Sequence, residues 1–185
     1  MNNLTPVVKN IILLNVFVFV ACLIYPELTD ILAMHYPTNP DFKPWQIITH
    51  MFTHGGFMHI LFNMFALYSF GSILERENVL GSKRFAFLYL FAGLGAIAFY
   101  IAINAGMAYY YIGDVFFTNE TNLPATLSES AVKSLGQIYY ASLVGASGAV
   151  YGLLAAFGYL FPNAPLAFMF IPIPIKAKYM IPMVI

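Results

Sequence analysis

The chain has 185 residues, of which 61% are hydrophobic and 9% are charged, and its formal net charge is zero. Soluble domains carry about 25% charged residues, so this composition indicates a protein embedded in the lipid bilayer, and the zero net charge argues against a nucleic-acid partner. The single cysteine, Cys22, excludes an intrachain disulfide.

Runs of apolar residues predict an all-α membrane protein. A helix that crosses a bilayer needs roughly 17–25 mostly apolar residues. The predicted spans are 7–25, 56–74, 85–104, 147–161 and a fifth that begins near 178 and is cut off by the end of the sequence. The first resembles the core of a signal peptide, but further spans follow it, so we predict an uncleaved first helix.

Basic residues predict how the spans are oriented, because cytoplasmic loops carry an excess of Lys and Arg. Lys43 and Lys133 fall on one side of the predicted topology. The other basic residues fall on the opposite side: Lys9, Arg76, Lys83, Arg84, Lys176 and Lys178. We therefore predict that this second side and the N-terminus are cytoplasmic.

The connections between the spans differ in character. Two long outer connections cover 26–55 and 105–142, and the second contains the polar stretch TNETNLPATLSESA, typical of an exposed outer loop region. The segment 164–175 is apolar, but its three prolines oppose a regular helix, so we predict a lipid-contacting loop there.

The fourth predicted span opens with a serine between glycines, GASG at 145–148. Ser147 is a good helix N-cap residue, and Gly148 with Gly152 forms a G-x-x-x-G face that lets helices pack closely in lipid. A catalytic serine is the third interpretation. Taken alone, the residues favour the two structural interpretations over the catalytic one.

The predicted depth of Ser147 favours the catalytic interpretation. The fifteen residues from 147 to 161 cover only about 22 Å of a hydrocarbon layer about 30 Å thick, so Ser147 is expected below the outer surface, facing protein or water. A helix N-terminus also offers free N–H groups and a partial positive charge, which suit an oxyanion. Tyr151 lies four residues on and shares this face.

Three of the four histidines lie in the stretch HMFTHGGFMHILFN at 50–63. His59 and Asn63 are four residues apart on one helix face, at the depth expected for Ser147, and polar groups inside a membrane usually line a functional pathway. Hydrogen bonding between helices, or a headgroup-level position for His50 and His54, would also explain them. A metal site is disfavoured, because no carboxylate or cysteine accompanies the histidines.

Together these motifs resemble the rhomboid family of intramembrane serine proteases. The matching stretches are HGGFMHILFNMFALYSFG at 54–71, the following Glu75-Arg76, GASGAVYG at 145–152 and PIPIKAKY at 172–179. The resemblance implies a rhomboid-like polytopic helix bundle of six or more spans around a water-filled cavity. About five of these spans are visible in a single membrane domain, 1–185, which we expect to be incomplete at its C-terminus.

The resemblance also implies residue roles, with no cofactor and no metal. Ser147 would be the nucleophile, His59 and Asn63 would donate to the oxyanion, Tyr151 would pack against the catalytic imidazole, Gly148 would allow close helix packing and His54 would be structural. Gln46, after Trp45, stands where many members have arginine, which puts in question any loop anchoring that needs a guanidinium.

A larger departure concerns the catalytic base, which the family places on a histidine of the sixth span. None of the four histidines here matches that position. We therefore expect residues 1–185 alone to lack proteolytic activity, because a serine without a base is a poor nucleophile.

For the full-length protein we expect a serine endopeptidase that cleaves transmembrane protein substrates in or near their spans. We expect it in the bacterial inner membrane as a multi-pass protein. The alternative is a non-catalytic rhomboid-like protein that binds transmembrane helices. A transporter is disfavoured, because the predicted spans carry no charge beyond Lys9 near one end.

Overall fold

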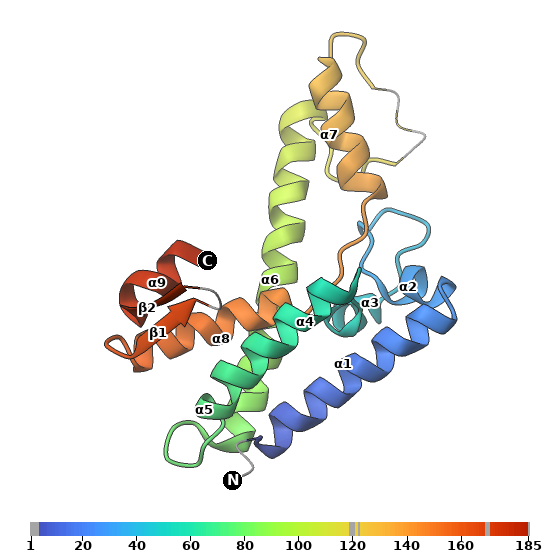
Figure 1. The fold of residues 1–185 in the computed structure, drawn as a ribbon. Coiled ribbons are helices and arrows are strands. Elements are labelled where there is room, and N and C mark those ends of the chain that lie inside the picture. The colour runs from blue at the N-terminus through green and yellow to red at the C-terminus, as the bar shows by residue number, and fades with distance from the viewer. Residues whose placement is uncertain (1–3, 119–120, 122, 169–170, 185) are drawn as a thin grey trace.

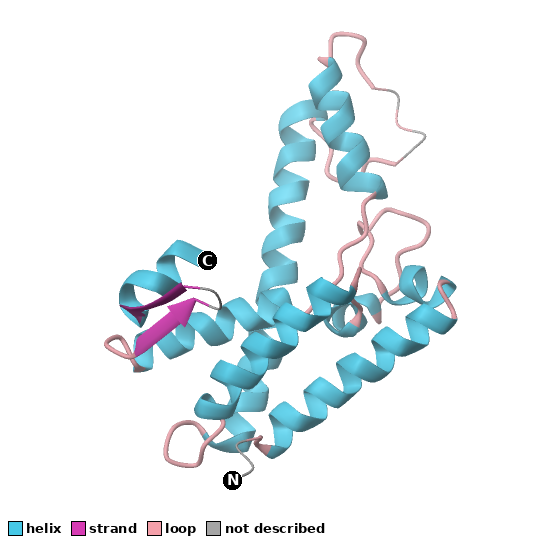
Figure 2. Cartoon of the chain, in the orientation of Figure 1, coloured by secondary structure: helices cyan, strands magenta, loops and turns pink. Residues whose placement is uncertain are grey.

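The computed structural model describes residues 4–118, 121, 123–168 and 171–184. Within these residues helices dominate, and the only strands form one hairpin (Figures 1 and 2). In this described part of the chain, three helical segments are long and apolar enough to cross a membrane: α1 (Pro6–Ile24), a second span (Phe57–Leu74) and α6 (Gly81–Ile112). They match the first three predicted spans, and the chain is an all-α polytopic membrane protein.

One buried carboxylate holds the start of α1 in place. The N–H groups of Val7 and Val8, which have no acceptor within the helix, each donate to Glu75 at 2.9 Å. The Ser82 hydroxyl at the start of α6 donates to the same carboxylate at 2.7 Å. Burial alone would raise the pKa of Glu75, but these hydrogen bonds lower the pKa below its ordinary value. Glu75 therefore joins three helix ends.

The second span is one continuous helix of three parts: α4 (Phe57–Ala66), the π-helical turn η2 (Leu67–Gly71) and α5 (Ser72–Leu74). A wide turn of this kind interrupts the regular helix and is often found near functional sites. Gly71 ends the turn, and a Cβ there would lie 3.0 Å from the Val8 side chain. The absence of a side chain at this position lets α1 approach the second span.

The shorter helix α8 (Ser147–Leu160) packs closely on α6. A Cβ on Gly148 would overlap the Cβ of Ala96, and a Cβ on Gly152 would overlap that of Ala92. The predicted G-x-x-x-G packing face is therefore real, and its partner is a pair of alanines one turn apart.

The first outer connection contains little regular structure, but several hydrogen bonds hold it in place. It contains α2 (Glu27–Leu32), α3 (Gln46–Thr49) and the 3-10 turn η1 (His50–Phe52). The indole N–H of Trp45 donates to the carbonyl of Ile31 at 3.0 Å, which fixes the start of α3 to the end of α2.

A buried glutamine anchors the same loop. The Gln46 side-chain oxygen accepts from the backbone N–H groups of His35 at 3.3 Å and Lys43 at 3.1 Å. Its amide nitrogen donates to the carbonyls of Asp41 at 2.9 Å and Ile31 at 3.3 Å. Gln46 is fully buried. A neutral amide thus performs the loop anchoring that the sequence had put in question, and no guanidinium is needed.

The second outer connection, 105–142, contains more helix than the sequence predicted. Helix α6 continues to Ile112 instead of ending near 104, and α7 (Glu129–Tyr140) lies beside its end, away from the other helices (Figure 1). The Ser128 hydroxyl caps α7 by accepting from the N–H of Ala131. The two helices share a small apolar cluster, separate from the main core: Tyr36, Ala108, Phe117, Leu135, Ile138 and Tyr139.

The prediction of a loop at 164–175 was wrong, although the prolines do exclude a helix there, as expected. Strands β1 (Pro165–Phe168) and β2 (Ile171–Lys176) pair antiparallel as a two-stranded hairpin, and residues 169–170 lie outside the described ones. Each strand of such a hairpin has one unpaired edge, where the missing N–H of Pro172 or Pro174 breaks no ladder bond. The prolines therefore exclude a helix but permit an edge strand.

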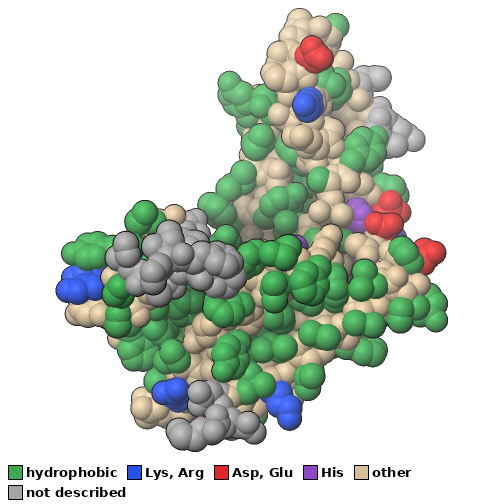
Figure 3. Space-filling view, in the orientation of Figure 1, with side chains coloured by type: hydrophobic (Ala, Val, Ile, Leu, Met, Phe, Trp, Pro, Cys, Tyr) green, Lys and Arg blue, Asp and Glu red, His purple; other side chains and the backbone are tan. Residues whose placement is uncertain are grey.

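One more helix follows the hairpin at the end of the described residues. Helix α9 (Ala177–Val184) begins one residue before the predicted start of the fifth span. In the space-filling view, hydrophobic side chains cover the middle of the molecule (Figure 3). Most basic side chains on this face lie toward its lower end, and the acidic ones lie higher.

Candidate active site

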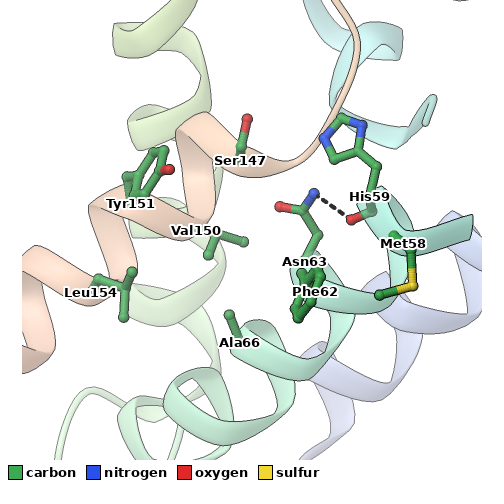
Figure 4. Close-up of a pocket in the computed structure, with 9 residues that line it drawn as sticks. All are labelled: Met58, His59, Phe62, Asn63, Ala66, Ser147, Val150, Tyr151 and Leu154. Carbon is green, nitrogen blue, oxygen red and sulfur yellow. Dashed lines mark hydrogen bonds between the residues drawn. The ribbon is translucent and has the colours of Figure 1, made fainter. Parts of the chain in front are cut away.

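A cavity of about 520 Å³ separates α4 from the first turns of α8 (Figure 4). Residues of the second span line one side and residues of α8 line the other. The lining residues are Met58, His59, Phe62, Asn63, Ala66, Ser147, Val150, Tyr151 and Leu154. Four of the six predicted site residues therefore share one space: His59, Asn63, Ser147 and Tyr151.

Ser147 is the first residue of α8 and is not its cap. Ala146 holds the N-cap position, and its carbonyl accepts from the N–H of Val150 at 2.9 Å. Among the described residues, the Ser147 hydroxyl makes no hydrogen bond. The N–H groups of the first turn have no acceptor within the helix, and they carry the positive end of its dipole. The N-cap interpretation of Ser147 is therefore wrong, and its hydroxyl is free.

The imidazole of His59 and the amide of Asn63 extend from α4 toward the start of α8 (Figure 4). Asn63 is 6% exposed, and its side-chain nitrogen donates to the His59 carbonyl at 2.9 Å. An asparagine amide has two N–H groups, so one remains for a ligand in the cavity.

Gly145 brings the serine and the histidine together. Its φ of +118° lies in the left-handed region, where only glycine is unstrained. A Cβ at this position would lie 2.6 Å from His59 Nε2 and 3.7 Å from the Ser147 hydroxyl oxygen. No role for Gly145 was predicted from the sequence, although its place two residues before the candidate serine was the available signal.

His54 lies behind the cavity and supports its wall. The His54 Nε2 atom accepts from the N–H of Ala146 at 3.5 Å, and its ring meets that of His59 edge-on with centroids 5.0 Å apart. Burial, with a smaller effect from His59, lowers the pKa of His54 to about 4. The ring is therefore neutral near pH 7, as an acceptor must be.

Backbone contacts tie the segment before Ser147 to the first outer connection. Leu143 and Met34 exchange two backbone hydrogen bonds of 2.8 and 2.9 Å, and the N–H of Gly145 donates to the His50 carbonyl at 2.8 Å. The His50 ring nitrogen Nδ1 in turn lies 2.8 Å from the carbonyl of Gln46. The outer loop that Gln46 anchors thus also braces the serine segment, through backbone groups that no short-range pattern in the sequence indicates.

The two other predicted residues on α8 point in different directions. Tyr151 lies one turn after Ser147 on the cavity side, and its ring is 46% exposed. Gly148 does not line the cavity, because it faces Ala96 of α6. Gly148 therefore sets the distance between the helices, while Tyr151 contributes to the wall of the cavity.

The contact between Gly148 and Ala96 also gives the depth of the site. Ala96 lies about 18 Å along α6 from Arg84, which marks one boundary of the apolar part of that helix. Within a hydrocarbon layer about 30 Å thick, Ser147 then lies about 10 Å inside the opposite boundary. Polar groups and a helix start at this depth must face protein or a water-filled cavity, and the cavity beside Ser147 provides such a space.

The chemistry of this donor set suits a negatively charged oxygen. A free hydroxyl, unpaired backbone N–H groups, an amide N–H and an imidazole converge on one space, as in an oxyanion site for acyl transfer. Within the described part of the chain, no three His, Cys, Asp or Glu side chains come together as metal ligands would.

Comparisons with known proteins agree on one family. Residues 41–185 match the family model described as "Rhomboid domain". The chain is 33% identical over 98 residues to Rhomboid protease GlpG of Haemophilus influenzae, a match that covers 48% of this chain and 50% of that protein. It is 41% identical over 58 residues to Rhomboid protease GluP of Bacillus subtilis, covering 31% and 11% of the two chains.

A mitochondrial relative matches this chain over a longer stretch. The chain is 29% identical over 167 residues to the Presenilin-associated rhomboid-like protein, mitochondrial, of Homo sapiens, which covers 89% of this chain and 35% of that protein. The chain thus spans half or less of the length of these relatives.

Proposed function

Because this chain belongs to the rhomboid family, we propose that the full-length protein is an intramembrane serine endopeptidase with Ser147 as its nucleophile. The observation that carries the proposal is the cavity that Ser147 shares with His59 and Asn63. Relatives named as rhomboid proteases support it.

In the proposed reaction the Ser147 oxygen attacks the carbonyl carbon of a peptide bond as its proton passes to a general base. The carbonyl oxygen becomes an oxyanion, which accepts hydrogen bonds from the Asn63 amide, the His59 ring and the N–H groups at the start of α8. The intermediate then collapses, and the protonated base gives its proton to the leaving amine. Water hydrolyses the acyl-enzyme, which restores the serine.

The proposal assigns the general base to a histidine outside residues 1–185. His59 lies beside the serine, but its place next to Gly145 suits an oxyanion donor, and His54 is engaged with the N–H of Ala146. Tyr151, on the cavity wall, is then the surface against which the incoming imidazole packs.

The proposed substrates are membrane proteins cleaved in or near their spans. The site lies beneath the membrane surface, so a spanning segment can reach it laterally. A regular helix hides its carbonyls in hydrogen bonds, so segments with small or helix-breaking residues should be cleaved faster. Cleavage of an uninterrupted leucine-rich helix at the same rate would contradict this preference.

We further propose that the protein resides in a bacterial inner membrane with its N-terminus in the cytoplasm. The support is the excess of Lys and Arg at one end of the spans. The site lies nearer the opposite boundary of the apolar layer, so it would then open toward the periplasmic side.

The test is cleavage of a single-span substrate by the full-length protein in proteoliposomes. Ser147→Ala should lower turnover by on the order of 10⁴-fold or more, with an unchanged melting temperature. Full activity of this variant would exclude Ser147 as the nucleophile. A wild-type protein that binds transmembrane helices and cleaves none of them would instead support the non-catalytic alternative.

A further inference from the structure

A shallow groove runs along the first turns of α6, beside the edge of the main core. It has a volume of about 680 Å³ and is lined by Lys83, Arg84, Phe87, Leu88 and Phe91. The buried stripe of the same helix is formed by other residues: Gly81, Phe85, Tyr89, Gly93 and Ile97. Four of the five groove residues are exposed, and Leu88 is half-buried against the main core, so the groove lies along the edge of the face that a spanning helix presents to lipid.

The cationic end of the groove is not neutralised by the protein. Within the described residues, neither Lys83 nor Arg84 pairs with a carboxylate. The nearest acidic residues along the chain are otherwise placed: Glu75 is turned inward to the start of α1, and the Glu77 carboxylate lies against Gly81. Two positive charges thus remain available at the point where α6 enters the apolar layer.

The other end of the groove is a flat aromatic wall. The rings of Phe87 and Phe91 are stacked, with centroids 4.1 Å apart and planes at 21°. They are 63% and 52% exposed, although both lie within the spanning part of α6. From Lys83 to Phe91 the helix rises about 12 Å, so charge and apolar wall are separated as a lipid headgroup and its acyl chain are.

We propose that this groove binds one anionic phospholipid. The phosphate contacts the Lys83 ammonium and the Arg84 guanidinium, which binds phosphate oxygens through two N–H groups at once. An acyl chain lies along Phe87, Leu88 and Phe91. The charge complementarity and the position at the membrane boundary fit a phospholipid, and the site is independent of the cavity at Ser147.

The experiment uses the full-length protein in phosphatidylcholine vesicles that contain a small fraction of phosphatidylglycerol with a photoreactive group in its acyl chain. After irradiation, mass spectrometry of peptides measures labelling between residues 83 and 91. A basic residue near the membrane surface favours an anionic lipid by about fivefold. The double variant Lys83→Gln/Arg84→Gln should therefore reduce labelling of this peptide by at least about tenfold.

Two controls make the result decisive. Lys9→Gln removes an exposed cation at the start of α1 and should leave labelling of residues 83–91 unchanged. A photoreactive phosphatidylcholine should label the same peptide several-fold less than the anionic probe. Equal labelling by the two probes would overturn the proposal, as would a double variant that labels like the wild type.

Discussion

The two ends of the second span bury polar groups in opposite ways. At one end Glu75 is 2% exposed, and its carboxylate accepts hydrogen bonds from α1 and from α6. At the other end His59 and Asn63 face a cavity beside Ser147, whose hydroxyl has no partner among the described residues. Buried polar groups whose hydrogen bonds are all made within the protein join helices, whereas polar groups with unused donors or acceptors mark the place where a ligand can bind.

The largest effect on activity, among changes outside Ser147 itself, is expected from Gly145→Ala. The backbone at this position is left-handed, a conformation in which alanine is strained. The new Cβ would also displace the His59 ring from Ser147. We expect cleavage of a single-span substrate to fall by about 10³-fold, the size of losing an oxyanion donor.

The matched control is Gly113→Ala at the end of α6. Gly113 also has a positive φ, +71°, but no atom lies within 4 Å of its Cβ position. This variant should lose about 1–2 kcal/mol of unfolding free energy and keep its turnover. Similar losses of activity in both variants would show that backbone strain alone explains the effect of Gly145→Ala.

Asn63→Ala should lower the turnover number by about 10²–10³-fold with little change in KM, because the lost hydrogen bond forms only with the oxyanion. Asn104→Ala is the control, since Asn104 makes the same bond to a carbonyl four residues earlier, at 2.9 Å, on α6. Steady-state kinetics of both variants measure the difference. An equal effect of the two substitutions would mean that Asn63 only stabilises its own helix.

Gln46→Leu should act on stability and on the site together. The substitution leaves several buried backbone groups without partners, so the unfolding free energy should fall by about 3 kcal/mol. The loss of the side-chain anchor should also loosen the outer loop. The segment before Ser147 is bonded to that loop through the His50 carbonyl, so the folded fraction should react several-fold more slowly. Gln137→Leu, at an exposed position on α7, should change neither quantity. An unaltered turnover of the folded Gln46→Leu protein would mean that Gln46 stabilises the outer loop and has no effect on the site.

Glu75→Gln tests whether the Glu75 end of the second span affects stability without affecting activity. An amide can accept only through its single oxygen, so one N–H at the start of α1 loses its partner, and the unfolding free energy should fall by about 2 kcal/mol. The turnover of the folded fraction should stay within about twofold of the wild type, and Glu77→Gln, at an exposed position, should leave stability unchanged. A large loss of turnover in Glu75→Gln would contradict the assignment of a purely structural role to this end of the span.

The effect expected to change activity least is a pH dependence of stability from His54. Its pKa of about 4 in the folded protein lies below its ordinary value of about 6.5, so the unfolded state binds more protons between these values. The unfolding free energy should therefore fall as the pH decreases from about 6.5 to 4, and be constant above that range. His50, whose pKa is also lowered by burial, contributes in the same direction. His54→Asn should flatten this slope in denaturant titrations at several pH values.

Much of the fold follows from hydropathy, and the exceptions have physical reasons. The first two spans were predicted to within one residue at each end, because long apolar runs in lipid have no alternative to helix. The extension of α6 to Ile112 depends on contacts with α7, which lies far along the chain. The hairpin was missed because proline excludes a helix without specifying a strand.

The site was partly predictable for similar reasons. The spacing of His59 and Asn63 placed them on one helix face, and the short fourth span placed Ser147 at a matching depth. Their meeting in one cavity did not follow from spacing and was expected only from the family resemblance. The only local signal for Gly145 is its place two residues before Ser147, because its role depends on the neighbouring His59 ring. The role of Gln46 depends on carbonyls scattered over the outer loop, so it has no local signal.

The most direct test of the account is the reaction of the full-length protein with a fluorophosphonate, followed by identification of the labelled residue. The account predicts one label per chain, on the peptide that contains Ser147, with a rate that falls in Asn63→Ala and not in Glu75→Gln. A label on another serine, or an active protease that takes no label, would contradict it.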